Sequence, residues 1–142
     1  MTGRSNTYLD APRAGEGGHL AQSAALDDLL GDLPRLDFVK MDVEGHEPAA
    51  LRGFWRNLTR HRPALVIEFN PHCLAVQRED SRAYLDQIFH LCPRVRITSA
   101  FGDDVVADRP DAVLSLWQRR DREVVAAGLL PSGKLHFDLS SV

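Results

Sequence analysis

Apolar residues form two short unbroken runs joined by a periodic segment. The runs Leu36–Val43 and Ala64–Phe69 are rich in β-forming residues and have polar or proline breakers on both sides. Such runs predict strands buried on both faces, as in a parallel sheet. Between them, Glu47–Arg60 predicts an amphipathic helix, with an apolar stripe of Leu51, Phe54, Trp55 and Leu58 and with Gly53 as a point of close packing. We therefore expect a strand–helix–strand unit whose strands are parallel and adjacent.

Weaker patterns predict the elements on either side of this unit. They indicate a short helix at Ala24–Leu30, a helix at 80–92, a half-exposed strand at Arg94–Ser99, a helix at 111–127 and a last strand at Leu135–Leu139. Strands and helices thus alternate from Leu36 onward. This order favours an open α/β sheet with right-handed crossovers.

Residues 1–22 differ from the rest of the chain. They carry glycine, serine, proline and charge without a period, and predict a mobile N-terminal segment with at most a short strand near His19–Gln22. Gly15, Gly17 and Gly18 predict a loop, because no apolar strand precedes them. We divide the chain into this segment and a folded part, 23–142.

Composition narrows the class of protein. The chain has 142 residues, which suits one domain, and a formal net charge of −3, which suggests neither a nucleic-acid nor a membrane-surface partner. Its apolar and charged fractions exclude a disordered chain, a collagen and a disulfide scaffold. Cys73 and Cys92 read as free thiols in a reducing compartment. With no signal peptide and no apolar run near the ~20 residues of a membrane span, the cytoplasm is the expected location.

Candidate chemistry lies where the two central strands end. In open α/β sheets, ligands bind beyond the carboxyl ends of the strands. Asp42, Glu44 and His46 follow the first strand, and Glu68 ends the second, before Asn70 and His72. Asp42 and Glu68 should therefore lie close together, with Glu44 nearby, and their like charges should raise at least one carboxyl pKa.

Simpler interpretations of the same residues stay open. Glu44 and Glu47 suit the positive end of a helix, and Asp42 suits a structural cap. His46 and His72 are more typical of exposed loop histidines than of metal ligands. Lys40 lies inside an apolar strand, where a buried ammonium needs a partner, and an acidic residue at the sheet edge is the natural one.

Taken together, these segments resemble the FkbM-type methyltransferase family. The similarity is carried by Leu26–Leu30, by the block Lys40-Met41-Asp42-Val43-Glu44-Gly45-His46-Glu47, by Leu51-Arg52-Gly53, and by Pro63 with Glu68. It covers residues 26–70, about a third of the chain. The combination of blocks in this order is specific, although each block alone is weak.

The resemblance implies a Rossmann-like class I methyltransferase sheet that uses S-adenosylmethionine to methylate a hydroxyl of a small molecule, sugar or lipid. Leu36–Val43 and Ala64–Phe69 are then its fourth and fifth strands. Asp42 faces the methyl-donor pocket, with Lys40 as a second cofactor-binding candidate. Asp42, Glu44, His46 and Glu68 are the candidates for taking the acceptor proton and placing the acceptor.

One part of that fold has no counterpart in the sequence. The donor site of a class I sheet uses a Gly-rich turn after a first strand and an acidic residue after a second, and neither fits ahead of Leu26. Residues 23–142 thus resemble the C-terminal part of the domain, with parallel strands and an antiparallel last strand. We expect weak donor binding by this chain, and self-association through an exposed strand at 36–43.

Three other interpretations are possible. A receiver domain also places an aspartate at a strand end, but its acidic pair and its lysine have no match here. A metal-dependent O-methyltransferase would hold Mg²⁺ between Asp42, Glu68 and Asn70. The chain is otherwise one piece of a split enzyme, or a non-catalytic remnant that serves as an interaction module.

Overall fold

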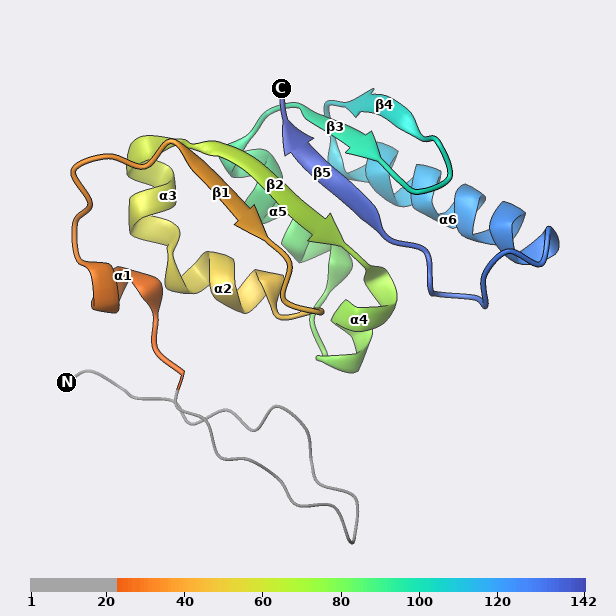
Figure 1. Ribbon diagram of the computed structural model, residues 1–142, viewed down its shortest axis with the longest axis horizontal. Coiled ribbons are helices and arrows are strands. Elements are labelled where there is room, and N and C mark those ends of the chain that lie inside the picture. The colour runs from red at the N-terminus through yellow and green to blue at the C-terminus, as the bar shows by residue number, and fades with distance from the viewer. Residues whose placement is uncertain (1–22) are drawn as a thin grey trace, which may run out of the picture.

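The computed structural model describes residues 23–142, which form a five-stranded sheet with helices (Figure 1). Its elements are α1 (Leu26–Leu30), β1 (Phe38–Met41), α2 (Glu47–Gly53), α3 (Trp55–His61), β2 (Ala64–Phe69), α4 (Pro71–Val76), α5 (Ser81–Leu91), β3 (Val95–Thr98), β4 (Asp104–Ala107), α6 (Pro110–Ala126) and β5 (Phe137–Ser141). The strands lie in the order β1-β2-β5-β3-β4. The possible strand at His19–Gln22, the glycine loop and the mobile segment fall outside the described residues.

Strand directions confirm the predicted arrangement of the first two strands. β1 and β2 are adjacent and parallel, in a register that runs from Phe38 opposite Ala64 to Met41 opposite Ile67. The last strand, β5, lies between β2 and β3 and is antiparallel to both, as expected for the last strand. The fold is therefore α/β, with a sheet that contains both parallel and antiparallel pairs of strands.

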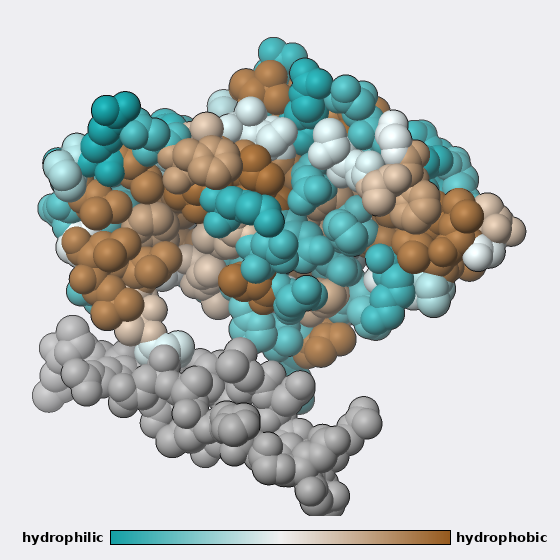
Figure 2. Space-filling model, viewed as in Figure 1, coloured by the Kyte–Doolittle hydropathy of each residue, from teal (hydrophilic) through white to brown (hydrophobic). Residues whose placement is uncertain are grey.

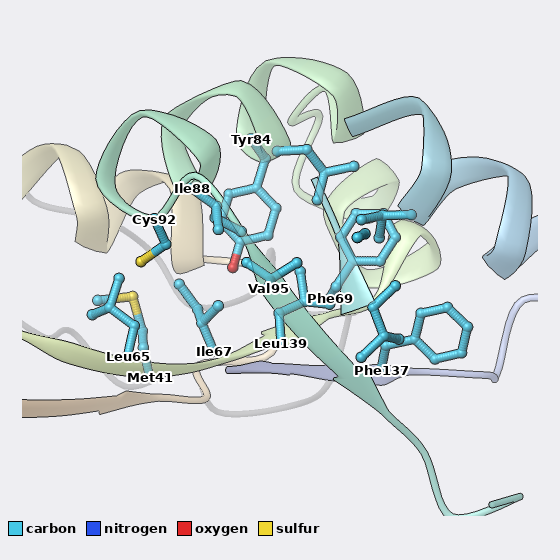
Figure 3. Packing of buried hydrophobic residues seen from close by; sticks show 14 of the residues in the cluster. Met41, Leu65, Ile67, Phe69, Tyr84, Ile88, Cys92, Val95, Phe137 and Leu139 are labelled. Carbon is cyan, nitrogen blue, oxygen red and sulfur yellow. The ribbon is translucent and has the colours of Figure 1, made fainter. Parts of the chain in front are cut away.

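The core lies between the sheet and its helices. Alternate side chains of β2 and β5, including Ile67, Phe69 and Leu139, point toward the helices, and Tyr84 and Ile88 of α5 point back at them (Figure 3). This period of two is typical of a strand with one buried face. Opposite Tyr84, the ring of Phe69 stacks at a centroid distance of 6.3 Å.

The prediction that Leu36–Val43 is a strand buried on both faces is wrong. The strand is shorter than predicted, and only its helix-facing side is covered: Met41 is buried, whereas Phe38 is 58% exposed and Lys40 is also exposed. Residues of the described sheet that face away from the helices form a surface that we call the open face. Figure 2 views this face, with hydrophilic side chains over its middle and hydrophobic ones over α1.

The predicted helix at Glu47–Arg60 is two helices. α2 ends at Gly53 and α3 begins at Trp55, with Phe54 between them at φ −123°. A glycine weakens a helix interior, which favours the break at this position. A Cβ at Gly53 would lie 3.3 Å from the Cα of Ala25, so the expected close packing at Gly53 is confirmed.

Two elements are absent from the sequence-based prediction. α4 begins directly after Asn70, whose side chain accepts hydrogen bonds from the backbone N–H groups of His72 and Cys73. An asparagine cap followed by proline is a helix-start signal that could have found it. β4 forms a hairpin with β3 and is mostly exposed. Its sequence therefore lacks the alternation of apolar and polar residues that would predict a strand.

The remaining predictions hold with shifted ends. α5 starts one residue after Asp80, which accepts a hydrogen bond from the N–H of Ala83, and α6 matches the predicted helix at 111–127. β5 runs two residues later than the predicted last strand. Cys73 and Cys92 are free thiols. Among the described residues, no helix is long and apolar enough to cross a membrane.

Candidate functional site

The turn between β1 and α2 is built around one buried carboxylate. Glu47 is 2% exposed, and its carboxylate accepts hydrogen bonds from the N–H of Val43 (2.8 Å) and the N–H of Gly45 (2.9 Å). Gly45 adopts φ +91°, and a Cβ there would lie 2.5 Å from the carbonyl oxygen of Cys73. Because only glycine fits this approach, the turn between β1 and α2 packs directly against α4.

Glu68 carries the neighbouring carboxylate, near the end of β2. Its side chain points to the open face yet is only 12% exposed, and the backbone carbonyl accepts a 2.8 Å hydrogen bond from the hydroxyl of Tyr84. The buried atom Oε2 has no hydrogen-bond partner among the described residues. An unpartnered buried carboxylate oxygen is free to accept a hydrogen bond from a ligand.

Asp42, Glu47 and Glu68 come together at the carboxyl ends of β1 and β2. Each offers a carboxylate oxygen, and these atoms all lie within 4.8 Å of one another. We call these three residues the carboxylate cluster. The predicted proximity of Asp42 and Glu68 is thus confirmed, while Glu47, expected as a helix-end anion, belongs to the same cluster.

The environment of Glu68 raises its pKa to about 7 from an ordinary 4.5. Burial is the main cause, because it disfavours the charged form, and His136 acts in the opposite direction. Asp42, Glu47 and Glu44 raise the pKa further by like-charge repulsion. The predicted upward shift of a carboxyl pKa is therefore confirmed, although desolvation exceeds the repulsion.

His136 joins the site from the far end of the chain. Its Nδ1 lies 3.9 Å from Oε1 of Glu68, and the imidazole is 48% exposed. Asp121 of α6 anchors the preceding turn, because its carboxylate accepts the N–H of Gly133 (2.9 Å) and the hydroxyl of Ser132 (3.3 Å). Closer to β5, the carbonyl of Leu135 accepts a 2.9 Å hydrogen bond from the indole N–H of Trp117. No local sequence signal links His136 to Glu68, because their contact depends on where β5 enters the sheet.

Glu44 and His46 lie at the margin of the site. Glu44 is exposed in the turn at φ +53°, and its Oε2 accepts a hydrogen bond from Sγ of Cys73 at 3.9 Å. Burial, then the charges of Glu44 and Glu68, raise the pKa of the Cys73 thiol. His46 is half-buried as the residue before α2, with no side-chain capping bond. His72 is exposed, as expected, but it lies in the first turn of α4 and not in a loop.

Lys40 differs from its expected burial but has the expected kind of partner. Its Nζ lies 3.4 Å from Oδ2 of Asp42, and the two side chains are 61% and 48% exposed. Lys40 is exposed because its side chain lies on the open face, which no helix covers in the described part of the chain. An ion pair this exposed contributes about 0–1 kcal/mol.

Asn70 has a different role from the one that the magnesium alternative requires. Its Oδ1 accepts the N–H of His72 (3.2 Å) and of Cys73 (3.3 Å), so this oxygen caps α4. The carboxylate cluster, with Glu47 in place of Asn70, is the set of oxygen ligands that could hold a cation. Oxygen ligands of this kind suit Mg²⁺ or Ca²⁺.

Within the carboxylate cluster, Asp42 is exposed, whereas Glu68 is 12% and Glu47 2% exposed. Hollows of about 270 and 320 Å³ lie elsewhere, one along α6 beside Phe101 and Arg120, the other between Arg52, Trp55 and Gln87. Neither contains the carboxylate cluster. Chemically, the cluster can accept protons, bind a cation or hydrogen-bond hydroxyl groups.

Comparison with known proteins identifies a family. A model of the methyltransferase FkbM domain matches residues 5–90, which include β1, α2, β2 and the whole carboxylate cluster. No curated protein and no solved structure gives a significant match. The match spans more than half of the chain, and the chain therefore belongs to the FkbM methyltransferase domain family.

Proposed function

We propose that this chain takes part in S-adenosylmethionine-dependent methylation of a hydroxyl oxygen on a small molecule, sugar or lipid, at the carboxyl ends of β1 and β2. Family membership supports methyl transfer in general. We further assign β1 and β2 to the fourth and fifth strands of a class I methyltransferase sheet. Their parallel pairing and the antiparallel β5 beside β2 support this assignment.

Glu68 is the proposed proton acceptor. A general base works best with a pKa near the working pH, and the pKa of Glu68 is about 7. Its unpartnered Oε2 can accept the hydrogen bond of the acceptor hydroxyl and then its proton. The exposed imidazole of His136, 3.9 Å from the same carboxyl group, is placed to pass that proton to solvent.

Asp42 is the proposed orienting group. When bound, S-adenosylmethionine would supply a methyl group on a positively charged sulfur, and that sulfur would keep the electron pair of the broken bond when the acceptor oxygen takes the methyl group. The carboxylates of Asp42 and Glu68 lie together and suit both this positive charge and the acceptor hydroxyl. Glu44, His46 and Lys40 surround them as secondary candidates for acceptor or donor contacts.

The observation that carries the proposal is the unpartnered Oε2 of Glu68 inside the carboxylate cluster. We would titrate the isotope-labelled chain with S-adenosylmethionine and follow backbone amide shifts by NMR. Shifts confined to residues 42–47 and 68–73 support the proposal, even when binding is in the millimolar range. Absent shifts up to saturating donor, or shifts confined to α6, contradict it.

Matched variants sharpen this titration. Asp42→Asn removes one charge from the cluster and should weaken donor binding about threefold or more. Asp108→Asn removes one charge from an exposed turn outside the site and should leave binding unchanged. Equal weakening by both variants would indicate attraction by net charge alone.

A metal-dependent form of the reaction is the second candidate. It is favoured by one observation, the 4.8 Å grouping of three carboxylates. Manganese as a paramagnetic probe at equimolar concentration should broaden amides near Asp42 and Glu68 if a cation binds there. Broadening that Glu68→Gln abolishes supports the metal form, and broadening spread over the acidic surface contradicts it.

A further inference from the structure

The carboxyl end of β2 is bordered by a turn from the C-terminal part of the chain. Phe137, the first residue of β5, lies opposite Phe69, the last residue of β2, so the residues before Phe137 lie beyond the end of β2. In open α/β sheets this is the region in which ligands bind. We call residues 131–136 the β5 turn.

Contacts on both sides fix the β5 turn in place. The buried carboxylate of Asp121 accepts the N–H of Gly133 at 2.9 Å, and the indole N–H of Trp117 donates to the carbonyl of Leu135 at 2.9 Å. A Cβ at Gly133 would lie 3.3 Å from Cβ and Nδ1 of His72, so the β5 turn also packs against the first turn of α4. The backbone between Gly133 and Leu135 is therefore anchored at both ends.

Lys134 brings a positive charge from this backbone to the site. Burial raises the pKa of the Cys73 thiol, and the charges of Glu44 and Glu68 raise it further, whereas that of Lys134 opposes the rise. The ammonium group of Lys134 therefore lies near enough to Cys73 to act on it, as the two carboxylates do. His136, the last residue of the β5 turn, places its Nδ1 3.9 Å from Oε1 of Glu68.

Charge divides the surroundings of Glu68 into two sides. The turn between β1 and α2 brings the carboxylates of Asp42, Glu44 and Glu47. The β5 turn and the first turn of α4 have the sequences Pro-Ser-Gly-Lys-Leu-His and Pro-His-Cys, which contain no acidic residue. The acidic residue of β5, Asp138, lies opposite Glu68 within the sheet and not beyond its end. The first side suits the positive sulfur of the donor, whereas the second suits a negative group.

We propose that Lys134, with the imidazoles of His72 and His136 beside it, binds a phosphate or carboxylate group of the methyl acceptor. This inference rests on the proposed function, in which Glu68 receives the acceptor hydroxyl. It narrows the acceptor to a molecule whose methylated hydroxyl lies near an oxyanion. An ammonium group binds either oxyanion as a point charge, and imidazole N–H groups add hydrogen bonds.

NMR titration of the isotope-labelled whole chain with glucose 6-phosphate, glucuronate and glucose tests this class of acceptor. Both anions should shift amides within residues 132–137 and 68–73, and glucose should bind at least about tenfold more weakly. Inorganic phosphate should shift residues 132–137 but bind more weakly than glucose 6-phosphate, because it lacks the hydroxyl groups that reach Glu68. Equal affinity for the two phosphates would overturn the link between this site and an acceptor.

A matched pair of variants tests the role of Lys134. Lys134→Gln should weaken binding of glucose 6-phosphate about fivefold or more and leave that of glucose unchanged. Arg94→Gln is the control, since Arg94 is exposed just before β3, at the opposite end of the sheet from the β5 turn. Both side chains are exposed, so both variants should fold, which a thermal melt verifies.

The proposal is overturned if glucose binds as tightly as glucose 6-phosphate, if the shifts avoid the β5 turn, or if both variants weaken binding equally. Titration with S-adenosylmethionine separates this inference from the proposed function. Donor shifts at residues 42–47 without anion shifts at the β5 turn overturn the anionic acceptor alone. The reverse result contradicts the proposed function and leaves the oxyanion site standing.

Discussion

A carboxylate that is 12% exposed, with one oxygen lacking a partner, is costly to ionise. Glu68 keeps this arrangement at the edge of the open face, where Asp42 and Glu47 add negative charge. The nearby imidazole of His136 lowers the pKa of Glu68 and so opposes this effect. The protein thus holds a proton-accepting group in a state that lowers its own stability, a combination common at functional sites.

The first prediction concerns the pH dependence of stability. The pKa of Glu68 is about 7 in the folded protein and near 4.5 in the unfolded chain, so the folded state binds the proton more tightly. The penalty is absent below pH 4.5, grows as pH rises to 7 and is constant above. Relative to the original chain, Glu68→Gln should gain about 1–3 kcal/mol of unfolding free energy between pH 4.5 and pH 8.

Urea denaturation at several pH values measures this difference. Asp108→Asn serves as the control for removal of a carboxylate from the exposed surface. If the difference between Glu68→Gln and the original chain is the same at pH 4.5 and at pH 8, the raised pKa is wrong.

The residues of the site differ in how far sequence reveals them. Asp42 and Glu68 could be predicted together, because parallel strands bring their carboxyl ends to one edge of a sheet. The Glu47 side chain is buried because its carboxylate accepts the two N–H groups of the turn, and no residue pattern predicts these hydrogen bonds. His136 lies 68 positions after Glu68, and only the insertion of β5 beside β2 brings them together.

At the scale of elements, the β1–α2 turn tests how the site is held in place. Gly45 and Gly102 both have positive φ, +91° and +83°, but only Gly45 lies against another backbone. Alanine at either position is strained by about 1–2 kcal/mol. Gly45→Ala should lose at least about 1 kcal/mol more than Gly102→Ala, because its Cβ overlaps the carbonyl of Cys73.

Chemical denaturation of the two variants gives this comparison directly. Gly102 is a matched control, since its added Cβ meets no atom within 4 Å. Equal losses would mean that the turn moves away from α4 without cost, and would contradict the tight packing of Gly45 against Cys73.

A buried amide on α3 is one of the groups that attach α1 to the rest of the fold. Asn57 is fully buried; its Nδ2 donates to Oδ1 of Asp27 (2.7 Å) and to the carbonyl of Gly31 (2.8 Å), while its Oδ1 accepts the N–H of Leu33 (3.0 Å). Asn57→Ala removes the side-chain partner of the N–H of Leu33 and of the carbonyl of Gly31, and should cost about 2–4 kcal/mol. Hydrogen exchange should accelerate at α1 amides such as Leu29 more than in α5. Uniform acceleration across both helices would contradict this local role.

The elements that sequence predicted are those with a strong period or a continuous apolar run, such as β2, α5 and α6. β1 differs, because a continuous apolar run predicts a strand but does not indicate whether a second layer of the protein covers its other face. The break at Phe54 and the hairpin strand β4 depend on contacts made elsewhere, at Ala25 and along β3. Cap signals such as Asn70-Pro71 hold local information that a search for hydrophobic periods misses.

At the scale of the molecule, the described sheet presents one covered face and one open face (Figures 1 and 2). The carboxylate cluster lies at the end of β1 and β2, where strand ends and the turn before α2 meet. In the class I sheet that the family resemblance implies, a donor also contacts a Gly-rich turn and an acidic residue from earlier strands. Residues 23–142 contain no such Gly-rich turn.

We therefore expect the chain to bind the donor at the cluster but weakly. A ligand present at its own dissociation constant stabilises a protein by only about 0.4 kcal/mol, which for a domain of this size shifts Tm by roughly 1–3 °C. S-adenosylhomocysteine at about 1 mM should thus raise Tm by no more than this amount, measured by circular dichroism. A low-micromolar dissociation constant would instead give about 4 kcal/mol and a shift beyond roughly 10 °C. Such a shift would mean that residues 23–142 and their N-terminal extension already form a complete donor site, and that the contacts expected from a Gly-rich turn are supplied in another way.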